Sequence, residues 1–364
     1  MQRGKRLVVE AFDRLNENFA ARVAEQDRKP ASQVEDGTLG LAHSLFSVGM
    51  FLGCAAAMHA QSGRRGCKPS FEECSMSERL LPDWGWACIL QAYDVNWAVE
   101  RRTSFIVGDT TIKVEAGGAW CCNVALASET AQLLDIFLPL VTAPGPLVVA
   151  QLGQSLDGRI ATESGASHYI NGPEARMHLH RLRAAVDAVI VGVGTLNADN
   201  PQLTVRHVPG VNPLRVVLDP RGRANPAARV FHDRSAPTLH LVADGGSGED
   251  PGAPGMVGSG ELVRRALPAG DAGFDPAVVL AWLHAAGYRR VLVEGGGVTV
   301  SRFLQAGVLD RLHMLVAPML IGSGRPGLAL PPIQSLAQAL RPMSRCFSCG
   351  GDVVFDLDLR RQMA

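Results

Sequence analysis

Residues 290–305 read RVLVEGGGVTVSRFLQ, and this stretch decides the fold. Arg290–Glu294 is a short apolar run that ends in a carboxylate, three glycines follow, and a helical pattern begins at Val298. A strand, a glycine turn and a helix in this order form the repeating unit of an α/β sheet. Ligands of such sheets bind at the carboxyl ends of the strands. The stretch therefore predicts both a fold class and the position of a site.

The same alternation continues on both sides of residues 290–305. A Gly/Pro/Asp-rich loop is expected between Gly245 and Gly273. Val353–Leu359 alternates apolar and acidic residues, which is typical of an exposed or edge antiparallel strand, so the sheet should be mixed. Further strands are predicted over Leu147–Leu152, Asp187–Val191, Leu214–Asp219, Thr238–Ala243 and Arg311–Ala317, and helices over Glu174–Val186, Pro276–Ala286 and Val298–Gln305.

The chain of 364 residues, 47% hydrophobic and 19% charged, is too long for one small domain and too apolar to be disordered. The Pro/Gly sequence Ala143–Pro146 predicts a domain boundary. We divide the chain into an N-terminal extension over residues 1–75, expected to be disordered in part, a small segment over 76–142 that contains four of the five tryptophans, and an α/β domain over 146–360.

The charge balance gives no electrostatic reason to expect a nucleic-acid partner or an anionic membrane. Lys+Arg and Asp+Glu are both 35, and the pI is about 7.1. The uncharged stretch Thr38–Gln61 is short for a membrane span, so a buried helix is favoured and an anchor is the alternative. Only four lysines occur, the last at Lys113. An anion bound beyond that point must be held by arginine, helix N-termini or backbone amides.

Eight cysteines in a chain of this length do not suggest a disulfide-rich secreted domain. Reduced thiols in a cytoplasm are the simpler interpretation. Cys346 and Cys349 form a CxxC sequence, but a zinc site needs about four ligands and the sequence has no second CxxC pair. We therefore expect no metal.

Three groups of polar and glycine residues follow predicted strands, and each has a structural alternative. Ser155–Gly158 contains Asp157, which could face a ligand or cap a polar turn. Gly192–Thr195 permits close approach of a ligand, although a simple turn explains it equally well. The glycines after Glu294 would expose amides at a helix N-terminus, which suits a pyrophosphate, or they could form only a tight connection.

The chain contains SLDGRIA at 155–161, INGPEAR at 170–176, VGVGT at 191–195, ADNPQLTVR at 198–206, RVVLD at 215–219, LVEGG at 292–296 and Ala317-Pro318. Taken together, these motifs resemble the pyrimidine reductase of riboflavin biosynthesis, the reductase domain of a bifunctional deaminase/reductase family. The resemblance covers residues 146–360. It implies a fold similar to dihydrofolate reductase, a mixed sheet with flanking helices, and a homodimer. It also implies reduction of a ribosylaminopyrimidine 5′-phosphate to its ribityl form by NADPH.

The family's functional residues transfer to matching positions of this chain. Apart from the resemblance, we predict Glu294 and Asp157 as the catalytic carboxylates, because each follows a strand at the edge where ligands bind. Arg183 and Arg206 would act as forks for the substrate phosphate, since lysine is absent. The resemblance places NADP at Gly153, Tyr169, Thr195, Asp199, Gly296, Gly297, Val298 and Thr299, and the substrate at Ser167, Arg183, Leu203, Arg206 and Glu294.

Two departures from the family pattern bear on function. Bifunctional relatives carry a zinc deaminase domain, and its signature is absent from this sequence. Gln151 stands where many members have lysine, and glutamine cannot transfer a proton as an ammonium group can. We expect a cytoplasmic NADPH-dependent reductase acting on a small phosphorylated substrate. The alternatives are a reductase of a pterin-like or related heterocycle and a non-catalytic nucleotide-binding regulatory module.

Overall fold

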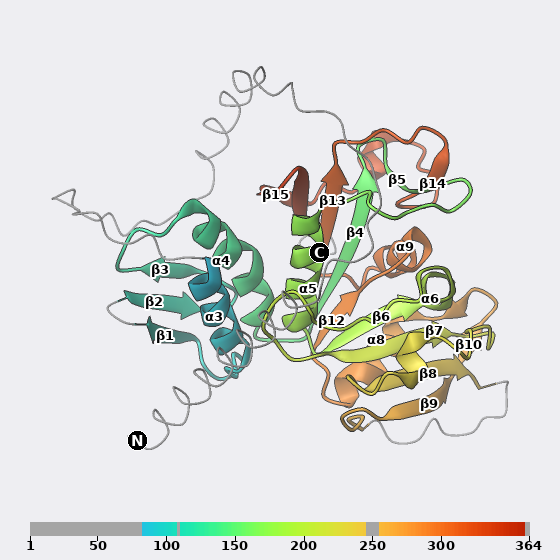
Figure 1. The fold of residues 1–364 in the computed structure, drawn as a ribbon, viewed down its shortest axis with the longest axis horizontal. Helices are drawn as coiled ribbons and strands as arrows, with labels where there is room; N and C mark the ends of the chain where they lie inside the picture. The colour runs from blue at the N-terminus through green and yellow to red at the C-terminus, as the bar shows by residue number, and fades with distance from the viewer. Residues whose placement is uncertain (1–81, 108–109, 245–254, 361–364) are drawn as a thin grey trace, which may run out of the picture. The chain divides into compact units, whose positions relative to one another are not determined.

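The computed structural model describes residues 82–107, 110–244 and 255–360 (Figure 1). The predicted extension 1–75 and the uncharged stretch Thr38–Gln61 lie outside these residues. All the described residues belong to one compact unit. Within them, no helix is long and apolar enough to cross a membrane.

A nine-stranded mixed sheet forms the centre of the fold, in the order β15-β16-β13-β4-β12-β6-β7-β8-β9. The strands from β13 to β9 pair in parallel, whereas β16 is antiparallel to both of its neighbours. The strands are β4 (Leu147–Ser155), β6 (Ala188–Gly192), β7 (Leu214–Asp219), β8 (Thr238–Ala243), β9 (Leu262–Leu267), β12 (Arg290–Val293), β13 (Arg311–Ala317), β15 (Met343–Cys349) and β16 (Asp352–Asp358).

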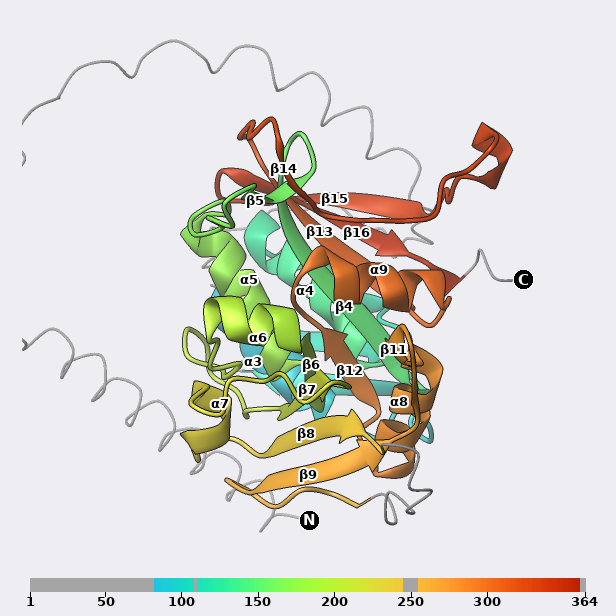
Figure 2. The ribbon, with the colours of Figure 1, turned by 90° about the vertical axis from the view of Figure 1, so that its right-hand side faces the viewer.

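Helices cover both faces of this sheet, because its parallel strands are apolar on both sides. On one face, α5 and α6 contribute Leu182 and Leu196 to a core with Val149 and Val189. On the other, α8 and α9 pack on Val148 and its neighbours (Figure 2). The helices are α5 (Pro173–Ala184), α6 (Val193–Asp199), α7 (Arg229–His232), α8 (Pro276–Ala285) and α9 (Gly297–Gln305), with a 3-10 turn at Leu336–Gln338.

The predicted fold class, a mixed sheet with flanking helices, is confirmed. Two expectations about single elements are wrong. The predicted loop 245–273 contains β9, which extends the sheet beside β8. The strand β16 is not at the edge, because β15 pairs with its outer side. Short ladders complete the fold: β5 (Arg159–Thr162) with β14 (Gly324–Pro326), and β10 (Ala269–Gly270) with β11 (Gly273–Phe274).

The tryptophan-containing segment folds as two helices and a small antiparallel sheet: α3 (Pro82–Tyr93), β1 (Arg102–Val107), β2 (Thr110–Glu115), β3 (Trp120–Cys122) and α4 (Ser128–Val141). Phe137 of α4 is fully buried and shares one core with Val149 of the large sheet. Tyr93 donates a hydrogen bond of 2.6 Å to Asp187, and the Arg290 guanidinium lies 3.6 Å from the centre of the Tyr93 ring. The segment thus packs directly on the large sheet, and the boundary proposed at Ala143–Pro146 stays a prediction.

Candidate functional site

A cavity of about 1060 Å³ opens at the carboxyl ends of β4, β6, β7 and β12, where an open α/β sheet is expected to bind ligands. It is large enough for a dinucleotide and a second small molecule. Of the sequence-predicted site residues, those that line it are Gly153, Ser167, Tyr169, Arg183, Thr195, Asp199, Leu203, Glu294, Gly296, Gly297, Val298 and Thr299.

The glycine turn before α9 forms one wall of this cavity. Gly296 is the N-cap of α9 and has no side chain to cap the helix, and residues 296–299 line the cavity. The Gly296 N–H donates to Thr195 Oγ1 at 2.7 Å, which joins this turn to α6. A side chain at Gly297 would collide with the backbone of Gly327. The turn therefore presents positive backbone groups in a fixed geometry.

Glu294 and Arg183 form a buried bidentate ion pair on the cavity wall. Arg183 Nε and Nη2 donate to the two carboxylate oxygens of Glu294, each at 2.8 Å. Their side chains are only 6% and 7% exposed. Burial lowers the pKa of Arg183, but the charge and hydrogen bonds of Glu294 outweigh this and raise it. The resemblance implied that both groups contact the substrate, and in the structure they bind each other.

The segment between α6 and β7 forms a second wall, and Arg183 helps to hold it. Arg183 Nη1 donates to the Thr204 carbonyl at 3.1 Å. Leu203 is buried and adopts φ +57°, a left-handed conformation that L-residues seldom take. A backbone in this conformation persists only where the surrounding residues hold it in place.

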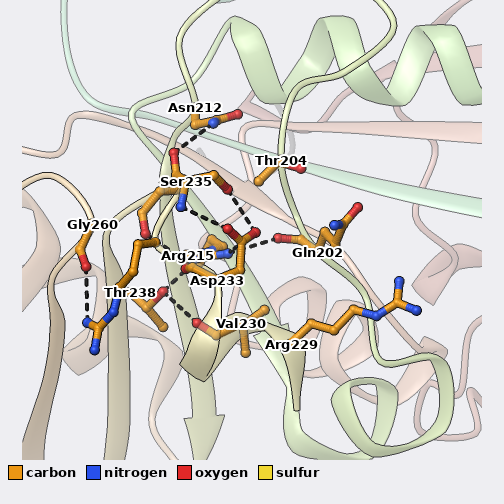
Figure 3. A network of polar contacts seen from close by, with 12 residues as sticks. Gln202, Thr204, Asn212, Arg215, Arg229, Val230, Asp233, Ser235, Thr238 and Gly260 are labelled. Carbon is orange, nitrogen blue, oxygen red and sulfur yellow. Dashed lines mark hydrogen bonds and ion pairs between the residues drawn. The ribbon is translucent and has the colours of Figure 1, made fainter. Parts of the chain in front are cut away.

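Arg215 of β7 supports the same segment from within the protein (Figure 3). Its side chain is fully buried and donates to the carbonyls of Gln202 at 3.3 Å, Asp233 at 2.6 Å and Ala236 at 2.7 Å. Arg215 Nε also donates to Thr238 Oγ1 at 3.0 Å. The loop is therefore tied to β7 and β8 by charge-assisted hydrogen bonds.

Arg206 lies at the exposed end of this loop and does not line the cavity. Its Nη1 donates to Gln202 Oε1 at 2.7 Å and to Thr204 Oγ1 at 2.9 Å. Both acceptors are neutral, so they direct the guanidinium without cancelling its charge.

Asp157, the second predicted catalytic carboxylate, also lies away from the cavity lining. It accepts hydrogen bonds from the Ser155 hydroxyl at 2.5 Å and from the amides of Ile321 and Gly322 at 3.1 and 2.6 Å. The Ser155 contact, followed by the Gly322 and Ile321 amides, lowers its pKa to about 2. The geometry gives Asp157 the turn-capping function that was the structural alternative in the sequence.

Tyr169 and Gln151 also line the cavity. Tyr169 is 80% exposed and adopts φ +67°, so its ring is presented to the opening by an unusual backbone. Gln151 lies on β4 beside His313 of β13. A side chain on Gly153 would collide with Asn171, so this glycine permits close packing of the segment before α5.

Sequence reasoning missed most of the cationic residues of the cavity. Arg221 and Arg223 follow β7 at its carboxyl end, and the signal was the sequence Asp-Pro-Arg-Gly-Arg directly after a predicted strand. Among the described residues, the cavity is lined by six arginines and two carboxylates, Asp199 and Glu294. The arginines are Arg176, Arg183, Arg221, Arg223, Arg302 and Arg325. Such a lining favours a ligand with several negative charges.

Asp219, the carboxylate that ends β7, does not offset this charge. It is fully buried and accepts from the amides of Arg223 at 2.7 Å and Ala224 at 2.9 Å, while His240 lies 3.1 Å away. Burial opposes ionisation of Asp219, but these contacts lower its pKa.

The fold and the cavity define a class of α/β domain with a nucleotide-sized, cationic site at its strand ends. The model of the RibD C-terminal domain matches residues 146–355, and the chain belongs to this family. A 2,5-diamino-6-ribosylamino-4(3H)-pyrimidinone 5′-phosphate reductase of Methanothermobacter thermautotrophicus is 35% identical over 59% of this chain and 99% of its own length.

Longer relatives match only in part. The riboflavin biosynthesis protein RibD of Aquifex aeolicus is 33% identical over 54% of this chain, which spans 53% of that protein. In one solved structure, Acinetobacter baumannii RibD, 27% of residues are identical, with 63% of this chain and 62% of that chain covered and a TM-score of 0.49. This chain thus spans about half to two thirds of the length of these RibD proteins.

Proposed function

We propose that the protein is an NADPH-dependent reductase of a ribosylaminopyrimidine 5′-phosphate, as in riboflavin biosynthesis. The observation that carries the proposal is that one cavity joins the glycine turn before α9 to the segment around Leu203 and Arg183. A cofactor at the turn and a substrate at the segment would then share one space. When bound, NADPH supplies the hydride that reduces the sugar C1′.

The residues present suit such a cofactor. The first-turn amides of α9 and the open space beside Gly194 form a cradle for a pyrophosphate. Thr195 and Asp199 of α6 provide neighbouring polar groups, and Tyr169 provides an exposed ring for stacking. What this chain supplies is alignment, exclusion of water and positive charge.

Preference for NADPH over NADH is supported by the end of β7. In Rossmann-type enzymes selective for NAD, a carboxylate binds the ribose 2′-hydroxyl. Asp219 is already occupied by backbone amides and His240. Arg221 and Arg223 line the same part of the cavity and could bind a 2′-phosphate.

The Arg223→Ala variant tests this preference. We expect the Kd for NADPH to rise about tenfold, the size of one charge-assisted hydrogen bond, with little change for NADH. Calorimetric titration with both cofactors measures the two effects. An equal loss of affinity for NADPH and NADH would show that Arg223 does not recognise the 2′-phosphate.

Steady-state NADPH oxidation tests the reaction itself. Both ring forms should be offered, the 2,5-diaminopyrimidinone and the deaminated 5-aminouracil, each as the ribosylamino 5′-phosphate. We expect turnover with at least one form and formation of its ribityl product. Tight NADPH binding without turnover of either form would instead favour a non-catalytic regulatory module. Turnover of a pterin would favour a reductase of a pterin-like heterocycle.

We also propose a homodimer. Leu320 and Leu336, which lie between β13 and β15, are each 74% exposed and would be covered in an assembly. Sedimentation equilibrium of the full chain measures the oligomeric state. The mass of a single chain at micromolar protein concentration would contradict the homodimer.

A further inference from the structure

The loop between α6 and β7, residues 200–213, is held by side chains rather than by its own backbone. Within the described part of the chain, no backbone–backbone hydrogen bond involves residues 201–212. Such a loop keeps one conformation only through its side-chain contacts. Leu203 of this loop lines the cavity, so the position of the 200–213 loop determines the shape of one cavity wall.

The first half of the loop is fixed by the α/β domain itself. Arg183 of α5 donates to the Thr204 carbonyl at 3.1 Å, and the Arg206 N–H donates to His180 Nδ1 of α5, also at 3.1 Å. The backbone of residues 207–212 receives none of these contacts, and most of these residues are exposed. The second half of the loop therefore needs another partner.

That partner comes from segment 82–142, whose tryptophans the proposed reaction does not explain. Trp86 of α3 donates its indole N–H to the Pro209 carbonyl at 2.9 Å. Among the described residues, this is the one hydrogen bond to the backbone of residues 207–212. Trp86 is 4% exposed, and its ring packs edge to face on Phe137 of α4, with centroids 5.4 Å apart. The donor is thus fixed by a buried core.

Contacts within the loop connect the Pro209 carbonyl to the cavity wall. A side chain at Gly210 would collide with α5, so the backbone beside Pro209 lies close against that helix. The Val205 N–H donates to Asn212 Oδ1 at 2.7 Å, which joins the two halves of the loop. Leu203 is two residues from Val205. A displacement at Pro209 is therefore transmitted to the wall through a short series of direct contacts.

We propose that Trp86 is a positioning residue for the substrate of the reductase and acts through the 200–213 loop. The inference rests on the proposed function, which assigns the substrate to this loop. Segment 82–142 precedes the matched family region, residues 146–355, and the inference gives it a function: it holds the substrate wall of the cavity in place. The glycine turn belongs to β12 and α9, so cofactor binding should be independent of Trp86.

Trp86→Phe tests this function, because it removes the indole N–H and keeps an aromatic ring in the core. We expect the KM for the pyrimidine substrate to rise about fivefold, the size expected for one neutral hydrogen bond. The kcat and the Kd for NADPH should change by less than about twofold, since neither depends on this bond. Steady-state NADPH oxidation and calorimetric titration with NADPH measure these values in the full chain.

Trp97→Phe is the matched control. Trp97 is 2% exposed and donates its indole N–H to the Ala92 carbonyl at 2.7 Å, so the same kind of bond is lost in the same core. Both variants should unfold at a lower temperature, but Trp97→Phe should keep the wild-type KM. An equal rise of KM in the two variants would mean that Trp86 contributes general stability alone, and the inference would be wrong.

Hydrogen exchange of the loop is a measurement that needs no turnover. The amides of Val205 and Arg206 are bonded to side chains, and they become accessible when the loop opens. We expect Trp86→Phe to speed their exchange about fivefold, as for the loss of one hydrogen bond, and Trp97→Phe to leave it unchanged.

Asn212→Ala tests the loop from its other side and leaves the core intact, so it remains informative if Trp86→Phe does not fold. It removes the acceptor of the Val205 N–H and should also raise the KM for the pyrimidine. In the double variant with Trp86→Phe, KM should rise by less than the product of the two single effects, because both residues hold the same loop. A full product, or an unchanged KM in Asn212→Ala, would contradict the path through the loop.

The outcomes separate this inference from the proposed function. If the wild type reduces a pyrimidine and Trp86→Phe changes neither its KM nor the loop exchange, the reductase assignment stands and the inference is overturned. If no pyrimidine is reduced but Trp86→Phe speeds exchange of the loop, Trp86 positions the loop and the reductase assignment fails.

Discussion

Glu294 shows how a single contact changes the expected outcome of a substitution. From the sequence alone, a free carboxylate beside the glycine turn looked suited to orient a sugar hydroxyl. The structure instead pairs both of its oxygens with Arg183 in a nearly dry site. A buried charge that loses its partner is costly, whereas the intact pair contributes little net stability. The pair therefore fixes the cavity wall.

Glu294→Gln should consequently lower stability as well as activity. The amide leaves the Arg183 charge buried without a counter-ion, and we expect the free energy of unfolding to fall by about 3 kcal/mol. Denaturant unfolding measures this loss, and NADPH oxidation measures activity. The double variant Arg183→Leu with Glu294→Leu should recover much of the stability and none of the activity. Unchanged unfolding of Glu294→Gln would mean that the ion pair is absent in solution.

Asp157 gives the opposite expectation. Since its carboxylate caps the turn and the amides of residues 321–322, Asp157→Asn should change kcat by less than about threefold, against the hundredfold or more expected for a general acid. Its low pKa in the folded protein means that its contribution to stability is present above about pH 4 and is lost as the pH falls toward 2. Thermal unfolding between pH 2 and 5 should be less pH-dependent in the variant. A large loss of kcat in a stable variant would restore the catalytic assignment.

At the level of elements, the strands with the clearest apolar pattern were the ones that the sequence predicted correctly. β7, β8 and β13 have the predicted bounds, because each is a run of apolar residues closed by Pro, Gly or Asp. β9 was missed because its sequence, LVRRAL, lies among Gly and Pro residues and has little apolar patterning. β15 was missed because MSRCFSC mixes serine and arginine with its apolar residues and shows no clear alternation, whereas its pairing with β16 identifies it as a strand.

The site was predictable in outline but not in its contacts. The glycine turn and Thr195 could be placed because they follow predicted strands, and strand ends gather at one edge. Leu203 lies between α6 and β7 and was placed only by the family resemblance. The Arg183–Glu294 pair joins residues 111 positions apart, and no periodicity encodes it. The same applies to His207, which contacts His180 only because the loop folds back along α5.

Asp356 of β16 binds charged side chains of β13 and β15, so its substitution tests how much these contacts between strands contribute to stability. It is buried, with Arg311, His313 and Arg345 around it, and Arg345 also donates to the Asp135 carbonyl of α4 at 2.7 Å. Burial opposes its ionisation, but His313 and Arg311 hold its pKa well below the usual range.

We expect Asp356→Asn to lower the free energy of unfolding by about 3 kcal/mol, because two arginines lose their shared anion. The wild-type contribution is present above about pH 4 and decreases at lower pH, so the difference between the proteins should narrow in acid. Urea unfolding at pH 7 and pH 3 measures both values. The substitution Asp358→Asn, at a half-buried residue, is the control and should have a smaller effect, since the Asp358 carboxylate is partly solvated. An equal effect of the two variants would contradict the buried network.

At the scale of the molecule, residues 82–142 and the large sheet share one apolar core. Phe137, Leu138 and Leu140 of α4 are fully buried, and the core that contains them also contains Leu147 and Leu182. Burial of each such side chain contributes about 2 kcal/mol. Together the three contribute about 6 kcal/mol, a large part of the roughly 5–15 kcal/mol that stabilises a typical domain.

Two truncated chains separate the extension from this core. A chain that starts at Met76 should fold and bind NADPH as the full chain does, because the motif residues that line the cavity all lie beyond that residue. A chain that starts at Leu147 retains the glycine turn, the Arg183–Glu294 pair and the whole large sheet, yet it exposes the apolar face that α3 and α4 cover. We expect it to aggregate or to unfold at a much lower temperature. Soluble yield, thermal unfolding and NADPH titration of the two chains provide the comparison. If the chain from Leu147 is stable and binds NADPH, residues 82–142 form an independent domain, as the Pro/Gly sequence at Ala143–Pro146 first suggested. Their contacts with the large sheet would then contribute little to its stability.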